Sequence, residues 1–280
     1  MQTKTSTEKV DTLRLGRVVP FYIEPFGSDE TQGAAAEGSP QDGSYLAIFL
    51  ELSVELIGSI SPDTGFIVNI TEIDKEVRRH ALPIFESHIK QHFRQTQNLS
   101  FAQLTDILWA CKERLDGRFG NAVIDKLSLK LSKFKEIAIS PEDRNMIYYT
   151  EKFEFSAMHK LWNENFTAQK NFEVFGKCAN PTGHGHNYII EITAKKTSDP
   201  TDFPTAAFQK TIKDNLIELL DHKNLNADVP FFSENIPTIE NIAVFSWNKL
   251  CGKFEHFRLH CITIRETDKT YCSYFGPSES

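Results

Sequence analysis

Cysteine is scarce in this sequence of 280 residues, and the cysteines that are present form no recognisable framework. Their number is odd, their spacing is irregular and no two stand in a Cys-x-x-Cys pair: Cys111, Cys178, Cys251, Cys261 and Cys272. The pattern argues against a disulfide scaffold and against a structural zinc finger built on cysteine. Because thiols stay reduced in the cytoplasm, the sequence predicts a cytoplasmic protein.

Long apolar segments are also missing. Residues 1–16 are polar and mixed in charge, without the apolar stretch of a signal peptide. No apolar run has the length that crosses a bilayer, so no membrane partner is expected.

Positive charge is not in excess, since 31 Lys and Arg stand against 38 Asp and Glu, for a formal net charge of −7. Nucleic-acid backbones require clustered Lys and Arg, and we therefore expect no nucleic-acid partner. This charge balance still leaves room for a local basic pocket that takes a small phosphorylated ligand.

Hydrophobic residues make up 40% of the chain and charged residues 25%, as in ordinary globular proteins. Each half follows the order strand, strand, helix, helix, strand, strand, which indicates an internal duplication with a boundary near 140–144. In the first half we expect strands within 17–24, 45–57, 66–70 and 123–139, a loop at 27–43, and helices over 71–92 and 100–115. In the second half we expect strands within 150–159, 183–195, 258–266 and 271–275, and helices over 204–220 and 237–250.

Three histidines in the second half suggest a metal site. His184 and His186 stand two apart at the start of a predicted strand, so their side chains share one face. His159 ends another strand, and antiparallel pairing of the two strands would bring the three imidazoles together. Three His ligands leave one position of a zinc ion open, as in catalytic sites. The His-Gly-His pattern taken alone is more often accidental.

Cys178 lies in a Gly-, Pro- and Asn-rich loop next to Lys177. A nearby cation lowers the pKa of a thiol, so we expect Cys178 to be reactive and read the other cysteines as packing residues.

Two acidic residues allow functional readings. Asp221 and His222 follow a predicted helix, and the sequence leaves two roles equally open: a proton-transferring pair, or a cation at the negative end of the helix. Glu266 alternates with Ile262 and Ile264, so its carboxylate shares an apolar face and needs a partner. A ligand with a guanidine-like NH–C–NH2 edge would be such a partner, because it offers two hydrogen-bond donors to the carboxylate.

Taken together, these residues resemble the 6-pyruvoyl-tetrahydropterin synthase and 6-carboxytetrahydropterin synthase family, from about Tyr148 to Gly276. The similar motifs are Phe153-Glu-Phe-Ser-Ala-Met-His159, Phe175-Gly-Lys-Cys-Ala-Asn-Pro-Thr-Gly-His-Gly-His-Asn-Tyr188, Leu220-Asp-His-Lys-Asn-Leu225, Pro237-Thr-Ile-Glu-Asn241 and Arg265-Glu-Thr267. Five motifs in the family's order make the resemblance highly specific.

The resemblance implies an α+β class made of tandem tunnelling-fold units, each an antiparallel four-stranded sheet with two helices on one face. It implies Zn²⁺ on His159, His184 and His186, Cys178 as general base, and Asp221 with His222 as a proton relay. The resemblance also implies that Glu266 binds the substrate, and that Thr238 and Glu240 match further positions that line the pterin pocket. The implied substrate is 7,8-dihydroneopterin triphosphate.

Two lyase reactions fit the resemblance. Carbon–oxygen cleavage gives 6-pyruvoyl-tetrahydropterin, and carbon–carbon cleavage gives 6-carboxytetrahydropterin on the route to queuosine. The Cys-Ala-Asn-Pro-Thr-Gly spacing is more similar to the pyruvoyl branch, and the other branch stays open. The alternatives are a catalytically silent pterin-binding or scaffold protein, and a zinc hydrolase in which Cys178 is dispensable.

The first half resembles a degenerate copy of the same unit. It has no histidine at the ligand positions, no matching cysteine and no Asp-His pair, so we expect residues 1–144 to bind no zinc and residues 145–280 to be catalytic. His88 and His92, four apart, fit a solvated helix face better than a metal pair. Because the family shares each site between neighbouring subunits, we expect a homotrimer that mimics a hexamer.

Overall fold

The computed structural model describes residues 12–26, 47–95, 98–197 and 203–277. The chain divides into two compact units, residues 1–147 with 197–202, and residues 148–196 with 203–280. The loop expected at 27–43 lies outside the described residues. No helix in the described ranges is both long and apolar enough to span a membrane.

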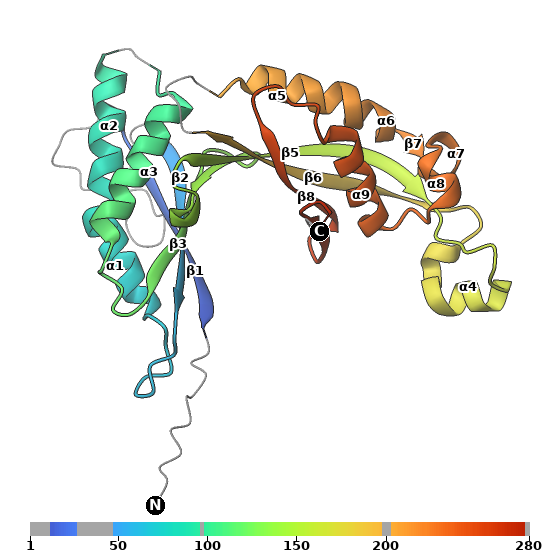
Figure 1. Cartoon of the computed structure of the whole chain (residues 1–280), viewed down its shortest axis with the longest axis horizontal. Coiled ribbons are helices and arrows are strands. Elements are labelled where there is room, and N and C mark those ends of the chain that lie inside the picture. The colour runs from blue at the N-terminus through green and yellow to red at the C-terminus, as the bar shows by residue number, and fades with distance from the viewer. Residues whose placement is uncertain (1–11, 27–46, 96–97, 198–202, 278–280) are drawn as a thin grey trace, which may run out of the picture. The chain divides into compact units, whose positions relative to one another are not determined.

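The described part of the first unit holds a four-stranded antiparallel sheet in the order β1-β2-β3-β4. The strands are β1 (Leu13–Ile23), β2 (Ile48–Gly58), β3 (Val123–Lys130) and β4 (Lys135–Ile139). The helices are α1 (Ile70–His80), α2 (Leu82–Arg94), α3 (Phe101–Leu115) and the short 3-10 turn η1 (Pro141–Asp143). Figure 1 shows α1, α2 and α3 beside this sheet.

Alternation along β2 explains the layering of the first unit. Leu50, Leu52, Val54 and Leu56 are buried, and the residues between them are less buried. Buried side chains of the helices complete this core, among them Ile73, Val77, Phe85, Ile107 and Leu108. The opposite face carries ion pairs, including Glu51 with Lys130 at 2.6 Å. One face of the sheet is therefore apolar and covered by helices, and the other is polar.

Two local predictions for this unit were wrong. The expected strand at 66–70 is absent from the described structure, because Asn69 instead caps α1 by accepting a hydrogen bond from Thr71 N at 3.0 Å. The single helix expected over 71–92 is split at Ala81. Pro83 lies in the first turn of α2, where its missing N–H costs nothing, and there it starts a new helix.

The described part of the second unit repeats this element order. Its four-stranded antiparallel sheet has the order β5-β6-β8-β9. The strands are β5 (Met146–His159), β6 (His184–Thr197), β8 (Arg258–Thr267) and β9 (Thr270–Tyr274). The first long helix is built from α5 (Thr205–Ile212), a π-helical turn η3 (Lys213–Ile217) and α6 (Glu218–Leu220), and the second is α9 (Ile239–Leu250).

Short elements fill the connections of the second unit. They are α4 (Ala168–Phe175), the 3-10 turn η2 (Gly176–Ala179), β7 (Lys223–Asn224), α7 (Leu225–Asp228) and α8 (Phe231–Glu234). β7 pairs in parallel with Ala157 and Met158 of β5. The predicted α+β class is confirmed: each unit is an antiparallel sheet with helices on one face.

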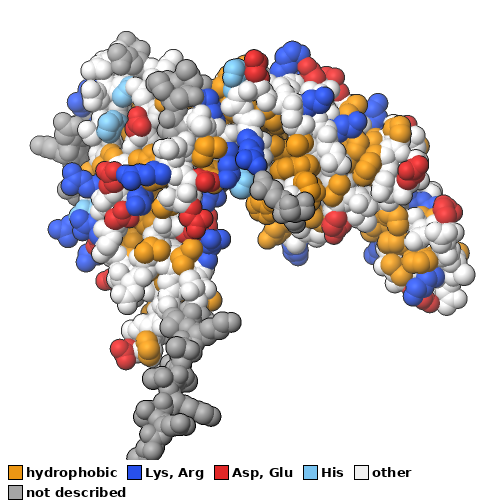
Figure 2. Space-filling view, in the orientation of Figure 1, with side chains coloured by type: hydrophobic (Ala, Val, Ile, Leu, Met, Phe, Trp, Pro, Cys, Tyr) orange, Lys and Arg blue, Asp and Glu red, His pale blue; other side chains and the backbone are white. Residues whose placement is uncertain are grey.

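The helix-covered face of the second sheet is apolar, with Ile190, Ile192, Ile262 and Ile264 fully buried. On the other face, Glu191 accepts hydrogen bonds from Lys152 Nζ at 2.8 Å and from Arg265 Nε at 2.7 Å. On the surface of each unit, Lys and Arg side chains lie among Asp and Glu side chains (Figure 2).

Candidate metal centre and active site

Three histidines meet at one end of the second sheet. His159 is the last residue of β5 and His184 the first residue of β6, so the pairing of these neighbouring strands places them side by side. His186 follows on the same face of β6. One ligating atom from each residue lies within 4.8 Å of the others, and the Nε2 atoms of His159 and His184 are 3.2 Å apart. Nitrogens bound to one tetrahedral zinc ion lie about 3.3 Å apart.

His159 is held in the tautomer that a metal ligand needs. Its side chain is 1% exposed, and its Nδ1 lies 2.8 Å from the carbonyl oxygen of Pro237. A carbonyl only accepts, so Nδ1 carries the proton and Nε2 turns its lone pair to the cluster. Burial lowers the pKa of His159, and burial also lowers the pKa of His186. Both imidazoles therefore stay neutral, as ligands must.

The unpartnered Nε2 of His186 supports the fit of a metal ion. His186 Nε2 and His184 Nδ1 are buried and make no hydrogen bond within the described structure. A buried polar atom without a partner is costly and calls for an explanation. A metal ion held by the three imidazoles would supply the partner of His186 Nε2. Neutral nitrogen donors in this number suit zinc.

Glu266 belongs to the same cluster. Its Oε1 lies 3.4 Å from His186 Nε2 and 3.6 Å from His159 Nε2. The residue lies on β8, two positions after the fully buried Ile264, as the alternation predicts. The carboxylate on an apolar face thus has imidazole neighbours, which the sequence did not reveal.

Cys178 lies in η2, and its expected low pKa is wrong. Burial first, and the negative charge of Glu266 second, raise the pKa of the thiol. Lys177 is exposed and does not offset them. The carbonyl oxygen of Cys178 accepts from Leu161 N at 2.9 Å, which ties the cysteine loop to the chain just after His159.

Gly183 fixes the approach to the His-Gly-His segment. Its φ of +68° lies in the left-handed region, which glycine adopts at little cost. A Cβ at this position would lie 2.8 Å from the carbonyl oxygen of His159. The close passage of the two segments therefore depends on glycine.

Tyr188 is a site residue that the sequence did not single out. It is fully buried, and its hydroxyl lies 3.3 Å from His159 Nδ1. Burial, together with the charge of Glu266, raises its pKa, so the phenol stays protonated. Its place two residues after His186, on the same face of β6, was the available signal.

The Asp221 and His222 pair forms, but the structure does not bring it to the histidine cluster. Asp221 Oδ1 accepts from Ser156 N at 2.9 Å, and Oδ2 lies 2.9 Å from His222 Nδ1. The N–H of Ser156 is the main cause that lowers the pKa of Asp221. The side chain of His222 is 83% exposed. The imidazole therefore faces outward from the edge of β5.

Thr238 and Glu240 have visible local roles. The Thr238 hydroxyl caps α9 by accepting from Asn241 N at 3.4 Å, directly after the carbonyl that holds His159. Glu240 is exposed in the first turn of this helix, and its charge helps to raise the pKa of Cys272. A direct part in ligand binding stays a prediction for both.

Residues 148–277 match the family model described as 6-pyruvoyl tetrahydropterin synthase. The 6-pyruvoyl tetrahydrobiopterin synthase of Poecilia reticulata is 37% identical over 140 residues, which cover 49% of this chain and 95% of that protein. The Homo sapiens enzyme of the same name is 35% identical over 130 residues, 45% of this chain and 90% of that protein. A solved structure of the Caenorhabditis elegans synthase covers 47% of this chain and 96% of its own, with 33% identity and a TM-score of 0.45.

Proposed function

Since the chain belongs to the 6-pyruvoyl tetrahydropterin synthase family, we propose that its second unit is a zinc-dependent lyase that converts 7,8-dihydroneopterin triphosphate. The observation that carries this proposal is the meeting of three histidines with Glu266 at one sheet end, with Cys178 within reach of the charge of Glu266. The relatives bear names of pterin synthases, which supports the pterin chemistry. Zinc and the particular substrate are our inference.

His159, His184 and His186 would hold the zinc ion. Bound zinc supplies a Lewis acid that draws electron density from the side-chain oxygens of the substrate and acidifies the adjacent C–H. Pro237 fixes His159 through Nδ1, and the burial of His159 keeps water away from its ring. A dry, oriented site strengthens every electrostatic contact made inside it.

Glu266 would bind the pterin ring. Its two oxygens match the two donors of the NH–C–NH2 edge, in a paired arrangement that favours planar ligands. Tyr188 lies beside Glu266 and helps to orient the carboxylate; burial first, and the charge of Glu266 second, raise the pKa of the phenol.

Cys178 would take the proton from the substrate carbon as general base. Burial first, and the charge of Glu266 second, raise the pKa of the Cys178 thiol and so favour the protonated form. A pterin that pairs with Glu266 screens that charge, and the thiol then loses its proton more easily. Binding of the ring and activation of the base are thereby coupled.

Asp221 and His222 would return a proton as a pair. Because the His222 side chain is 83% exposed on its own unit, we assign it to the site of a neighbouring subunit. We propose a homotrimer in which second units form one ring and first units another, because only second units carry the pair.

The decisive experiment is incubation of the zinc-loaded protein with 7,8-dihydroneopterin triphosphate, followed by mass spectrometry. We expect 6-pyruvoyl-tetrahydropterin and inorganic triphosphate, the outcome of carbon–oxygen cleavage. A product with the mass of 6-carboxytetrahydropterin would assign the carbon–carbon branch. Unchanged substrate would favour a silent binding protein, and release of phosphate alone would favour a hydrolase.

A further inference from the structure

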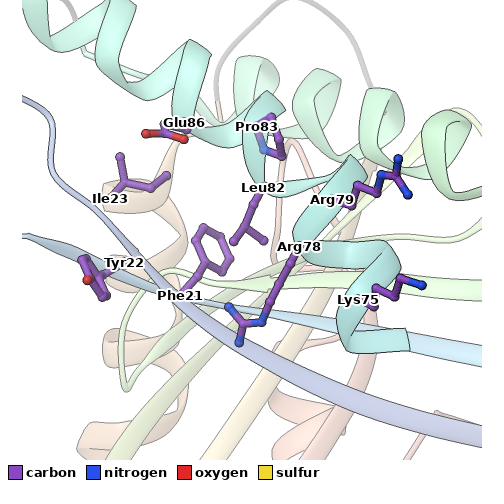
Figure 3. A pocket seen from close by; sticks show the side chains of 9 residues that line it. All are labelled: Phe21, Tyr22, Ile23, Lys75, Arg78, Arg79, Leu82, Pro83 and Glu86. Carbon is purple, nitrogen blue, oxygen red and sulfur yellow. The ribbon is translucent and has the colours of Figure 1, made fainter. Parts of the chain in front are cut away.

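The first unit contains a cavity of about 630 Å³ beside the end of β1. Its floor is formed by Phe21, Ile23 and Leu82, and its walls by residues of α1 and α2 (Figure 3). This volume is within the range of small-molecule sites. The cavity lies wholly within the first unit, so it is separate from the histidine cluster.

Three cations line this cavity from one face of α1: Lys75, Arg78 and Arg79 stand at i, i+3 and i+4. Arg78 donates from Nη2 to the carbonyl oxygen of Pro20 at 3.2 Å, and Figure 3 shows its side chain reaching toward β1. Lys75 and Arg79 are exposed at the rim. The cluster stands out in a chain whose net charge is −7.

The neighbouring carboxylates are already paired. Asp74 accepts two hydrogen bonds from Arg17, at 2.8 and 2.6 Å. Glu86, the acidic residue of the cavity wall, lies 2.8 Å from Lys90 Nζ. In the described part of the chain, Lys75 and Arg79 therefore make no ion pair with these carboxylates.

Glu76 is likewise engaged, at 3.3 Å from His80 and 3.5 Å from Arg118. The positive charge at the cavity is thus available to a ligand.

The second unit shows why this space is open. There the chain leaves α6 at Leu220, turns through Asp221 and His222, and lays β7 along Ala157 and Met158, just before the end of β5. Phe21 and Tyr22 are the third-last and second-last residues of β1, as Ala157 and Met158 are of β5. In the first unit the described chain continues from α1 into α2 instead. The cavity thus lies beside the positions of β1 that correspond, by this count, to the positions of β5 paired with β7 in the second unit.

We propose that this cavity binds an organic phosphate with an apolar or aromatic body. Guanidinium and ammonium groups at the rim match the phosphate oxygens, and arginine does so with paired donors. Phe21, Ile23, Leu82 and Pro83 offer apolar contacts to the rest of the molecule. This proposal does not depend on the pterin reaction of the second unit.

The test uses phenyl phosphate as probe and isothermal titration of the full, zinc-loaded chain. The variant is Lys75→Ala with Arg79→Ala. The matched control is Arg114→Ala with Arg144→Ala, which removes the same charge from exposed positions of the same unit. We expect the wild type and the control to bind equally, and the cavity variant to bind about tenfold more weakly or worse. Circular dichroism verifies that both variants are folded.

Further probes define the ligand class. We expect inorganic phosphate to bind more weakly than phenyl phosphate, and benzyl alcohol not to bind. The proposal is overturned if the wild type, the cavity variant and the control variant bind phenyl phosphate equally. It is also overturned if the wild type shows no saturable binding of phenyl phosphate. Equal affinity for inorganic and phenyl phosphate overturns the apolar part. Binding of an acidic peptide in place of phenyl phosphate, lost in the cavity variant, replaces the proposal with a protein-docking surface.

Discussion

His159 donates its Nδ1–H to the carbonyl oxygen of Pro237 across 2.8 Å, which joins the end of β5 to the residue that precedes the cap of α9. The contact spans 78 positions of the sequence. It sets the tautomer of a buried imidazole through a backbone atom, so no side-chain substitution at position 237 removes the acceptor. The metal-facing nitrogen of His159 is therefore fixed by the fold itself.

Zinc content is the first prediction. His184→Ala should remove the metal, because the two imidazoles that remain hold zinc poorly. The control is His88→Ala, an exposed histidine of the first unit. Elemental analysis after dialysis should give one zinc per chain for the wild type and the control, and almost none for His184→Ala. Two zinc ions per wild-type chain would contradict the prediction that the first unit binds no zinc.

Removal of the thiol should separate chemistry from metal binding. Cys178→Ala should lower turnover by about 10²- to 10⁴-fold, the usual contribution of a general base, with zinc retained. Cys251→Ala, at an exposed cysteine, serves as control and should keep full activity. The measurement is the rate of product formation at saturating substrate, alongside zinc content. Unchanged turnover in Cys178→Ala would favour the hydrolase alternative.

Gly183 should matter beyond its backbone conformation. Gly183→Ala places a Cβ 2.8 Å from the His159 carbonyl oxygen at a φ of +68°. Gly252 has a φ of +72° and open space around its Cβ position, so Gly252→Ala carries the backbone strain without the clash. We expect zinc affinity to fall about tenfold or more in Gly183→Ala alone, as for loss of a supporting contact. Equal zinc affinity in the two variants would show that the clash relaxes without moving the ligands.

The ion pairs of Glu191 should give a pH-dependent contribution to stability. Burial raises its pKa, but hydrogen bonds from Lys152 and Arg265 outweigh burial, and the pKa lies below the ordinary value. The stabilisation is present above the unfolded-state pKa and is lost as pH falls through the lower folded-state pKa. Glu191→Gln should lower the free energy of unfolding by about 1–3 kcal/mol at pH 7.

Denaturant unfolding of wild type and Glu191→Gln across pH 7 to 3 measures this difference. The gap between the two curves should narrow as the wild-type carboxylate is protonated. A gap that stays constant down to pH 3 would assign the loss to packing rather than charge. Glu55→Gln, at a 3.7 Å pair of the first unit, is the matched control and should change stability less.

Subunit mixing tests the place of His222. If each site takes Cys178 from one chain and His222 from its neighbour, coexpressed Cys178→Ala and His222→Ala chains should regain activity. Random assembly restores about a quarter of the sites, because each interface needs an intact residue from both sides. Each variant alone should show only a small fraction of the wild-type activity. No recovery in the mixture would mean that His222 serves the site of its own chain.

The sequence predicted the parts of this site that depend on short-range regularity. The spacing of His184 and His186, and of Ile262, Ile264 and Glu266, follows from the two-residue period of a strand. Regular periods are visible within one segment, so no knowledge of distant contacts is required.

What the sequence did not predict depends on contacts between distant segments. The pKa of Cys178 is set by burial and by Glu266, while the adjacent Lys177 points to solvent. The exposure of His222 follows from the path of the chain along the edge of β5. The split of α1 from α2, in contrast, follows from a local feature, because Pro83 favours the first turn of a new helix.

The position of the three histidines at the ends of two paired strands also bears on the order of folding. His159 is separated from His184 by the connection 160–183, which must close before the two imidazoles meet. Zinc therefore has no assembled site until β5 and β6 have paired, and metal uptake should follow sheet formation. A metal that binds only the folded state also stabilises that state, by an amount that rises with the logarithm of its free concentration. The thermal stability of the second unit would then report the zinc supply around it.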